Sequence, residues 1–382
     1  MTADRYCRKL QGVDNVARMT CYLVGTESLL VQCAESLLAR GHEILGIISS
    51  APIICGWADD HRVPHVGLTD RLADVLSARP FDYLFSVTNL ELLPRAVVDM
   101  PRRLAVNFHD GPLPRYAGMH ATTWALLAGE PAYAVTWHRM GGRVDEGDIL
   151  IQEPVPIAPD DDTALTLNTK CYEAGMRSFA RLLDDLELDR IVPRPQDLAS
   201  RTYFGRNRRP AGAGSIAWNR PAEAIAVLAR ALDFGHSANP LALPKAWNGP
   251  AVLTLGGIEI LATTSSLAPG TVVDAQPRRL IVATGSSDVA FTSVGDADGM
   301  IGPDLAALDF TAALVTPAGA DIERWTSILE ELAPHEPFWV ERLSHATPLE
   351  APNAASPHAA AVEEPGSLKM EVDEVALAAL QQ

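Results

Sequence analysis

The chain has 382 residues but only five cysteines: Cys7, Cys21, Cys33, Cys55 and Cys171. Their number is odd and no pair has the Cys-x-x-Cys spacing of metal or redox sites, so we expect reduced thiols in the core and no metal. The sequence has no run of about 20 apolar residues. Its N-terminus also lacks the basic-then-apolar pattern of a signal peptide. These absences predict a cytoplasmic protein that does not bind membranes.

Positive charge is also scarce. Lysine and arginine number 31 against 48 aspartates and glutamates, which gives a formal net charge of −17. Because a protein that binds nucleic acid normally presents a basic face, we expect no nucleic-acid partner. Basic residues do gather at 102–103 and at 201–209. We interpret the second cluster as a solvated linker in preference to a phosphate site.

The start of the chain lacks a dinucleotide-binding fingerprint. Gly25 stands alone after the apolar run 21–24, whereas that fingerprint needs three spaced glycines and a later acid, so we assign no nicotinamide cofactor. A strand over 21–24, a helix over 28–40 that stops at Gly41 and a strand over 43–49 predict a doubly wound, mostly parallel α/β sheet. The further elements expected in this half are helices over 68–78, 121–128 and about 162–186, the last capped by Asp161 or Asp162, and strands over 83–86, 132–140 and 148–155.

Arginine, proline and glycine concentrate at 201–215, where we place a domain boundary. Beyond a helix over 221–232, short strands separated by glycine turns predict a small barrel. These strands are expected over 251–262, 270–273, 279–283 and 289–294. The predicted division is a mobile extension (1–18), a catalytic domain (19–200), a linker (201–215), a barrel-like domain (216–310) and a helical and flexible tail (311–382). Within the tail we expect helices over 321–332 and 369–380, with a flexible segment rich in alanine and proline over 346–365.

The most informative segment is 106–118, which reads Val-Asn-Phe-His-Asp-Gly-Pro-Leu-Pro-Arg-Tyr-Ala-Gly. Asn107 and His109 are two residues apart at the end of an apolar run, so on a strand they face the same way. The turn that follows places both at the strand's carboxyl end, where open α/β sheets bind ligands. A second segment, 143–150, supplies Asp145.

An amide, an imidazole and a carboxylate suit acyl transfer to an amine. Asn107 can donate to an oxyanion, His109 can donate, accept or carry a proton, and Asp145 can hold the imidazole in one tautomer. The attacking ammonium must also lose a proton. Taken singly, each residue has a structural alternative: Asn107 caps a turn, His109 fills a polar corner, and Asp145 solvates a loop.

The order Asn-x-His, Leu-Pro-x-Tyr-x-Gly (113–118) and Asp-x-Gly-Asp (145–148) resembles the formyltransferases that use 10-formyltetrahydrofolate. These are the methionyl-tRNA, glycinamide ribonucleotide and sugar-nucleotide amine enzymes. The similarity covers 20–200 well and 215–310 more loosely. It implies a Rossmann-like formyltransferase domain followed by an oligonucleotide-fold-like β-barrel. It also implies that Asn107 and His109 bind the developing oxyanion, while Asp145 holds His109 and helps to move the proton.

The same resemblance implies 10-formyltetrahydrofolate as co-substrate, cradled largely through backbone groups of two loops. The residues expected to bind it are Ser86, Thr88, Asn89, Leu90, Leu92, Leu113, Gly141, Gly142, Arg143 and Asp148. Those expected to bind the acceptor are Asp110, Arg115, Tyr116 and His120. Family members usually carry Gly-Ser-Leu after the histidine, where this chain has Asp110-Gly111-Pro112. Asp110 could raise the basicity of His109, bind a substrate amine or form a turn with Gly111; we slightly favour the turn.

The acidic charge argues against tRNA as acceptor, as does the short segment 50–65, where tRNA-formylating relatives carry a longer basic insertion. We therefore expect transfer to an amine or hydroxylamine of a small or carrier-protein-bound acceptor in secondary metabolism. The ending, with Pro-His-Glu-Pro-Phe-Trp at 334–339, resembles formyltransferase modules of nonribosomal peptide synthetases at the point where a linker begins. An ordinary docking tail and the amino-sugar N-formyltransferase branch stay open. So do a hydrolase that passes the formyl group to water, a non-catalytic interaction module, and a homodimer formed through the barrel edge or the C-terminal helix.

Overall fold

The computed structural model describes residues 18–69, 71–237, 239–296, 305 and 308–344. It divides into two compact units, Met1–Pro334 and His335–Gln382. The predicted N-terminal extension (apart from residue 18), the Ala/Pro-rich segment 346–365 and the helix over 369–380 lie outside the described residues, as does Cys7.

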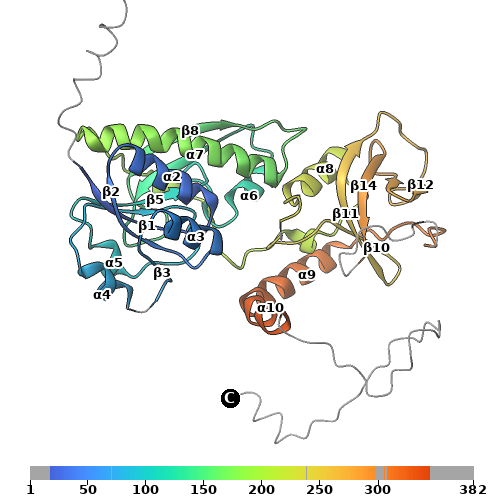
Figure 1. Cartoon of the computed structure of the whole chain (residues 1–382). Coiled ribbons are helices and arrows are strands. Elements are labelled where there is room, and N and C mark those ends of the chain that lie inside the picture. Colours follow the sequence, from blue (N-terminus) through green and yellow to red (C-terminus); the bar gives the residue numbers. More distant parts are fainter. Residues whose placement is uncertain (1–17, 70, 238, 297–304, 306–307, 345–382) are drawn as a thin grey trace, which may run out of the picture. The chain divides into compact units, whose positions relative to one another are not determined.

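A seven-stranded sheet forms the N-terminal half of the first unit (Figure 1). The first five strands in its spatial order are parallel, β7 runs antiparallel to them, and β8 pairs antiparallel with β7 and so runs in the direction of the first five. That order is β3 (His65–Val66), β2 (Glu43–Ile48), β1 (Thr20–Val24), β4 (Tyr83–Ser86), β5 (Leu104–His109), β7 (Ala132–Arg139) and β8 (Ile149–Pro156). The predicted doubly wound, mostly parallel sheet is confirmed.

Helices cover both faces of this sheet because its strands are apolar on both sides. One core contains side chains of α2, α3, α6 and α7 together with Val106 and Phe108 of β5. A second core contains side chains of α4 and α5 together with Ala105. The helices are α2 (Ser28–Ala39), α3 (Pro52–Asp60), α4 (Leu72–Ser77), α5 (Arg95–Val98), α6 (Ala121–Leu127) and α7 (Ala164–Glu187). Since side chains alternate along a strand, Asn107 and His109 project to the same face as Ala105, the face of α5.

Several helix ends differ from the prediction. Helix α7 is capped by Thr163, whose side chain accepts from the Thr166 N–H in a reciprocal capping box, and not by Asp161 or Asp162. The Asp162 carboxylate instead accepts from the Ala158 N–H and pairs with Lys170. Helix α3 was not predicted; it begins with a proline, which suits the first position of a helix. Helix α4 begins at Leu72, four residues later than predicted.

The C-terminal half of this unit has an antiparallel five-stranded sheet, a half-barrel where we predicted a small barrel. Its order is β10 (Lys245–Asn248), β11 (Ala251–Ile260), β14 (Val289–Gly295), β13 (Arg279–Val282) and β12 (Val272–Gln276). Helix α8 (Ala222–Ala231) packs against β11 around the buried rings of Trp218 and Phe291, and α9 (Gly319–Leu332) packs on the short 3-10 turn Ala211–Gly214.

Part of the segment predicted as a linker is ordered. Strand β9 (Tyr203–Phe204) pairs in parallel with β6 (Ala117–Gly118), the end of the motif turn. The guanidinium of Arg201 donates to the Val144 carbonyl and that of Arg206 to the Leu90 carbonyl. These arginines therefore hold neighbouring loops and are not simply solvated. The domain bounds themselves stay a prediction.

In the second unit, α10 (Glu336–Ser344) is a helix where we expected a linker to begin. Pro337 lies in its first turn, where a backbone N–H would have no partner within the helix, so the proline breaks no helical hydrogen bond. In the described part of the chain, no helix combines the length and apolarity needed to cross a bilayer.

Candidate active site

Strand β5 brings Asn107 and His109 to the carboxyl end of the parallel sheet, as predicted. In the sheet register, Asn107 lies between Ser86 of β4 and His138 of β7, and His109 lies opposite Thr136. The Asn107 side chain is half-buried, whereas that of His109 is only 5% exposed. The imidazole is therefore almost fully enclosed, whereas the amide keeps some access to solvent.

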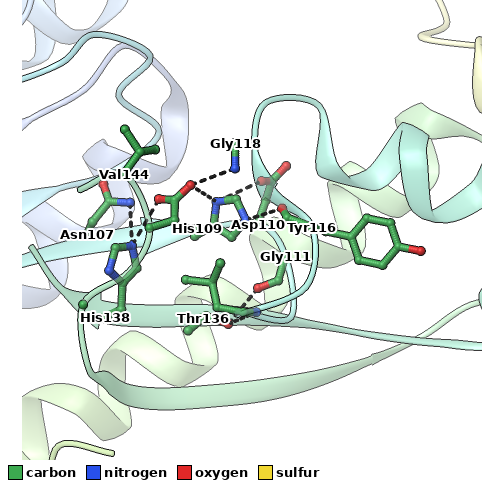
Figure 2. Close-up of polar contacts among 12 residues, drawn as sticks. Asn107, His109, Asp110, Gly111, Tyr116, Gly118, Thr136, His138 and Val144 are labelled. Carbon is green, nitrogen blue, oxygen red and sulfur yellow. Dashed lines mark hydrogen bonds and ion pairs between the residues drawn. The ribbon is translucent and has the colours of Figure 1, made fainter. Parts of the chain in front are cut away.

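The His109 ring is held by a backbone carbonyl. Its Nε2 donates to the Tyr116 oxygen at 2.8 Å, which leaves Nδ1 as the nitrogen that can gain or lose a proton. Nδ1 lies 3.8 Å from Oδ2 of Asp145 and 3.9 Å from Oδ1 of Asp110 (Figure 2). A Cβ at Gly111 would come within 2.7 Å of Nε2, so residue 111 must be glycine for the ring to sit here.

Asp145 is the second anchor of the site. Its Oδ2 accepts from the Gly118 N–H at 2.8 Å, and its Oδ1 lies 3.5 Å from Nε2 of His138. Burial alone would raise the pKa of this carboxyl, but the two histidines and the Gly118 N–H lower the pKa well below its usual range. The backbone of Asp145 lies in the left-handed region, with φ +58°. This conformation is strained for a residue other than glycine, and residues strained in this way cluster at functional sites. Asp145 is therefore a fixed, ionised carboxylate.

His138 is a site residue that we did not predict. The Asn107 amide donates to Nε2 of His138 at 3.1 Å, and Nδ1 of His138 donates to the Arg139 carbonyl at 3.0 Å. His138 thus fixes the amide of Asn107 (Figure 2), and the same nitrogen lies 3.5 Å from Oδ1 of Asp145. The alternation of strand 132–140 was visible in the sequence, but its pairing with β5 was not.

A cavity of about 340 Å³ lies on the α5 face of β5. Its floor includes Ala105, two residues before Asn107 and on the same side of the strand. Its lining residues are Arg95, Val98, Asp99, Pro101, Arg103, Leu104, Ala105, Arg139, Met140, Gly141, Gly147 and Asp148. Of the residues predicted to bind the co-substrate, Gly141 and Asp148 are among them.

The other predicted co-substrate residues lie elsewhere. Leu113 is buried in a small cluster with Ala117 and Ile149, so its side chain offers no surface to a ligand. The Asn89 amide bonds to the backbone of Glu91 and shapes its own loop. Ser86 is buried at the end of β4, Thr88 has φ +51°, Leu90 and Leu92 are exposed, and Gly142 and Arg143 lie in the exposed loop after β7.

Two of the four residues predicted to bind the acceptor have partners within the protein. The Arg115 guanidinium and the Tyr116 hydroxyl both bond to Glu130, and the Tyr116 ring stacks on Phe204. They hold the 113–118 turn in place. Asp110, in contrast, lies beside His109, with its Oδ1 3.9 Å from Nδ1 of the imidazole.

His120 borders the same region. Burial lowers the pKa of its imidazole, the nearby Asp110 carboxylate raises that pKa, and the charges of Arg209 and Arg206 lower it further. The described residues contain no group of three or more side chains arranged to hold a metal.

Residues 64–183 match the family described as formyl transferase. Among solved structures, WlaRD, a sugar 3N-formyl transferase crystallised with dTDP and 5-N-formyl-THF, is similar with a TM-score of 0.58 and 17% identity, over 74% of this chain and 99% of that chain. The N-formyltransferase of Helicobacter canadensis, in complex with folinic acid and dTDP-3-aminofucose, gives 0.54 and 17%, over 72% and 99%. HypX of Aquifex aeolicus, in complex with tetrahydrofolic acid, gives 0.55 and 15%, over 74% of this chain but 45% of that one.

At these identities the structures establish a shared fold, while the match over 64–183 identifies the domain that carries Asn107, His109 and Asp145. Residues 64–183 thus match the formyl transferase family, and the segment that carries Asn107, His109 and Asp145 lies within this match.

Proposed function

We propose that the protein transfers the formyl group of 10-formyltetrahydrofolate to a primary amine or hydroxylamine. The observation that carries this proposal is the convergence of Asn107, His109 and Asp145 at the end of β5, with a cavity on the same face of that strand. With its formyl carbon near Asn107, the folate would extend back along β5 toward Ala105 and into the cavity.

The cavity fits the pterin end of a folate. Val98, Ala105 and Met140 supply apolar contacts for a flat ring, and its volume of about 340 Å³ lies in the range of small-molecule sites. The Gly141 backbone and the Asp148 carboxylate can accept hydrogen bonds from the ring's amino group. The three arginines of the lining suit the carboxylates of a folate tail. Folates are also the ligands named with WlaRD, the Helicobacter enzyme and HypX.

The catalytic side chains have separable roles. One hydrogen of the Asn107 amide is donated to His138. The second is available to the oxygen of the formyl group. His109 presents Nδ1 to the same region, 3.8 Å from the ionised carboxylate of Asp145. An oxyanion donor of this kind contributes roughly 100- to 1000-fold in rate. The amine nitrogen bonds to the formyl carbon, the bond to N10 breaks, and an amine proton ends on N10.

For the acceptor we propose a small or carrier-protein-bound amine of secondary metabolism, not a nucleic acid. The net charge of −17 supports this choice because a polyanionic acceptor would be repelled. WlaRD is named as a sugar formyltransferase, which supports amino sugars as one class to test.

The test incubates the full chain with 10-formyltetrahydrofolate and a panel of amino sugars, aminoacyl amides and hydroxylamines, and measures tetrahydrofolate release. We expect release that depends on the amine, and a loss of about 100- to 10,000-fold in His109→Ala. The control His61→Ala removes an exposed histidine and should change nothing.

Formate release that no amine accelerates would indicate a hydrolase instead. If no amine gives tetrahydrofolate and the protein binds no folate, the proposed function is wrong.

A further inference from the structure

Asp110 has an unusual position for a carboxylate. It follows His109 directly, its side chain is 31% exposed, and its Oδ1 lies 3.9 Å from Nδ1 of His109, too far for a hydrogen bond. Among the described residues, no donor bonds to its carboxylate. The Asp110 carboxylate therefore keeps acceptor capacity that no described protein group uses.

The structure removes the explanation that we favoured from the sequence, a turn formed with Gly111. An aspartate shapes a turn by accepting from the N–H two residues ahead, but that residue is Pro112, which has no N–H. The turn is held by other groups: Leu113 N–H donates to the Gly111 carbonyl, and Thr136 donates to the same carbonyl. The carboxylate of Asp110 is therefore not needed for the local fold.

Two carboxylates face one nitrogen. Oδ2 of Asp145 and Oδ1 of Asp110 lie 3.8 Å and 3.9 Å from Nδ1 of His109, each leaving room for a bridging donor (Figure 2). An alkylammonium group has three N–H donors and a single positive charge. Asp145 already accepts from Gly118 and faces His138, so Asp110 is the carboxylate with free acceptor capacity.

From this arrangement we propose that Asp110 binds the acceptor's amine in its protonated form and makes the enzyme selective for cationic primary amines. The inference rests on the proposed function and specifies its acceptor. The ammonium binds to Asp110 and releases one proton to solvent. The resulting amine nitrogen then bonds to the formyl carbon, and its second proton ends on N10 as the bond to N10 breaks. Asp110 is unchanged at the end.

The test compares two classes of nucleophile, cationic and neutral, at neutral pH, with 10-formyltetrahydrofolate saturating. Glucosamine and valinamide are the cationic probes, and hydroxylamine is the neutral one. In Asp110→Asn we expect kcat/KM for the cationic probes to fall by roughly 10- to 100-fold, mainly through KM, which is the range for a lost hydrogen bond to a charged group. For hydroxylamine we expect a change of about threefold at most.

Asp110→Glu retains the charge and should recover part of the loss. Asp74→Asn removes an exposed carboxylate that pairs with Arg71 and serves as the matched control, with no change for either probe. A thermal unfolding curve close to that of the wild type shows that Asp110→Asn folds.

Equal losses for hydroxylamine and the cationic probes would show that Asp110 acts on His109 and overturn the inference, as would no loss for either. These results are distinct from failure of the proposed function, in which the wild type itself transfers formyl to neither probe. In that case the inference falls with it.

Discussion

Replacing Gly118 by alanine should damage both the fold and the catalytic site. Gly118 has φ +99°, and a Cβ there would lie 2.1 Å from the Phe204 carbonyl oxygen in the paired strand β9. The clash is with backbone, so the β6–β9 pair must shift. The same residue donates its N–H to Asp145, and a shift of the pair moves that donor.

The size of the effect follows from two contributions. An alanine in left-handed backbone costs about 1–2 kcal/mol, and weakening a hydrogen bond to a carboxylate costs about 1.5–3 kcal/mol. A loss near 3 kcal/mol should lower the melting temperature by roughly 6–12 °C, if each kcal/mol lowers it by about 2–4 °C in a domain of this size. Since a displacement of about 1 Å can cost 100-fold in rate, turnover should fall by at least about tenfold.

Thermal unfolding and tetrahydrofolate release measure these two effects. Gly129→Ala is the matched control: Gly129 also has positive φ, at +67°, but nothing lies within 4 Å of its added Cβ. That variant should lose only about 1–2 kcal/mol and keep its turnover. If Gly118→Ala matches Gly129→Ala in both measurements, the coupling between the β6–β9 pair and Asp145 is refuted.

Two further predictions concern pH. Because the folded-state pKa of Asp145 is lowered, its ionised form stabilises the fold above the ordinary carboxyl pKa of about 3.9, and the stabilisation is lost as pH falls toward the folded value. Asp145→Asn should therefore have a lower melting temperature than the wild type at neutral pH, and the difference between the two melting temperatures should narrow below about pH 4. A difference that does not change with pH contradicts this prediction. Turnover should rise from about pH 5 to 8 as the acceptor amine loses its proton. Asp145 stays ionised over this range and should not contribute to the pH dependence. A flat rate from about pH 5 to 8 would show that deprotonation of the amine does not limit the reaction.

The sequence was sufficient for most of the longer elements, although not for α3, and for the central strand of the site. The apolar run before Asn107 and the Gly/Pro turn after His109 predicted β5 and its end, because both signals are local. The strand 83–86 was predicted at its observed bounds for the same reason.

The residues missed depend on pairing between strands. His138 is a site residue only because β7 pairs antiparallel with β5 in a register that sets it opposite Asn107. Periodicity gives the alternation of a strand but not its neighbour. Gly118 was visible as a turn glycine, yet its role as a donor to Asp145 needs β9, about 85 residues later in the chain.

The reversal of direction at β7 also explains why the cavity lies where it does. Since β7 runs back along β5, it ends at Arg139, opposite Val106, behind the catalytic residues. The chain must then return forward to deliver Asp145, and directly afterwards it passes close to β7 at Gly147, where a Cβ would lie 1.7 Å from the Arg139 carbonyl oxygen. The returning loop passes beside Ala105 and closes one side of the cavity. A single antiparallel strand therefore positions His138, carries the loop of Asp145 and forms a wall of the space proposed for the pterin.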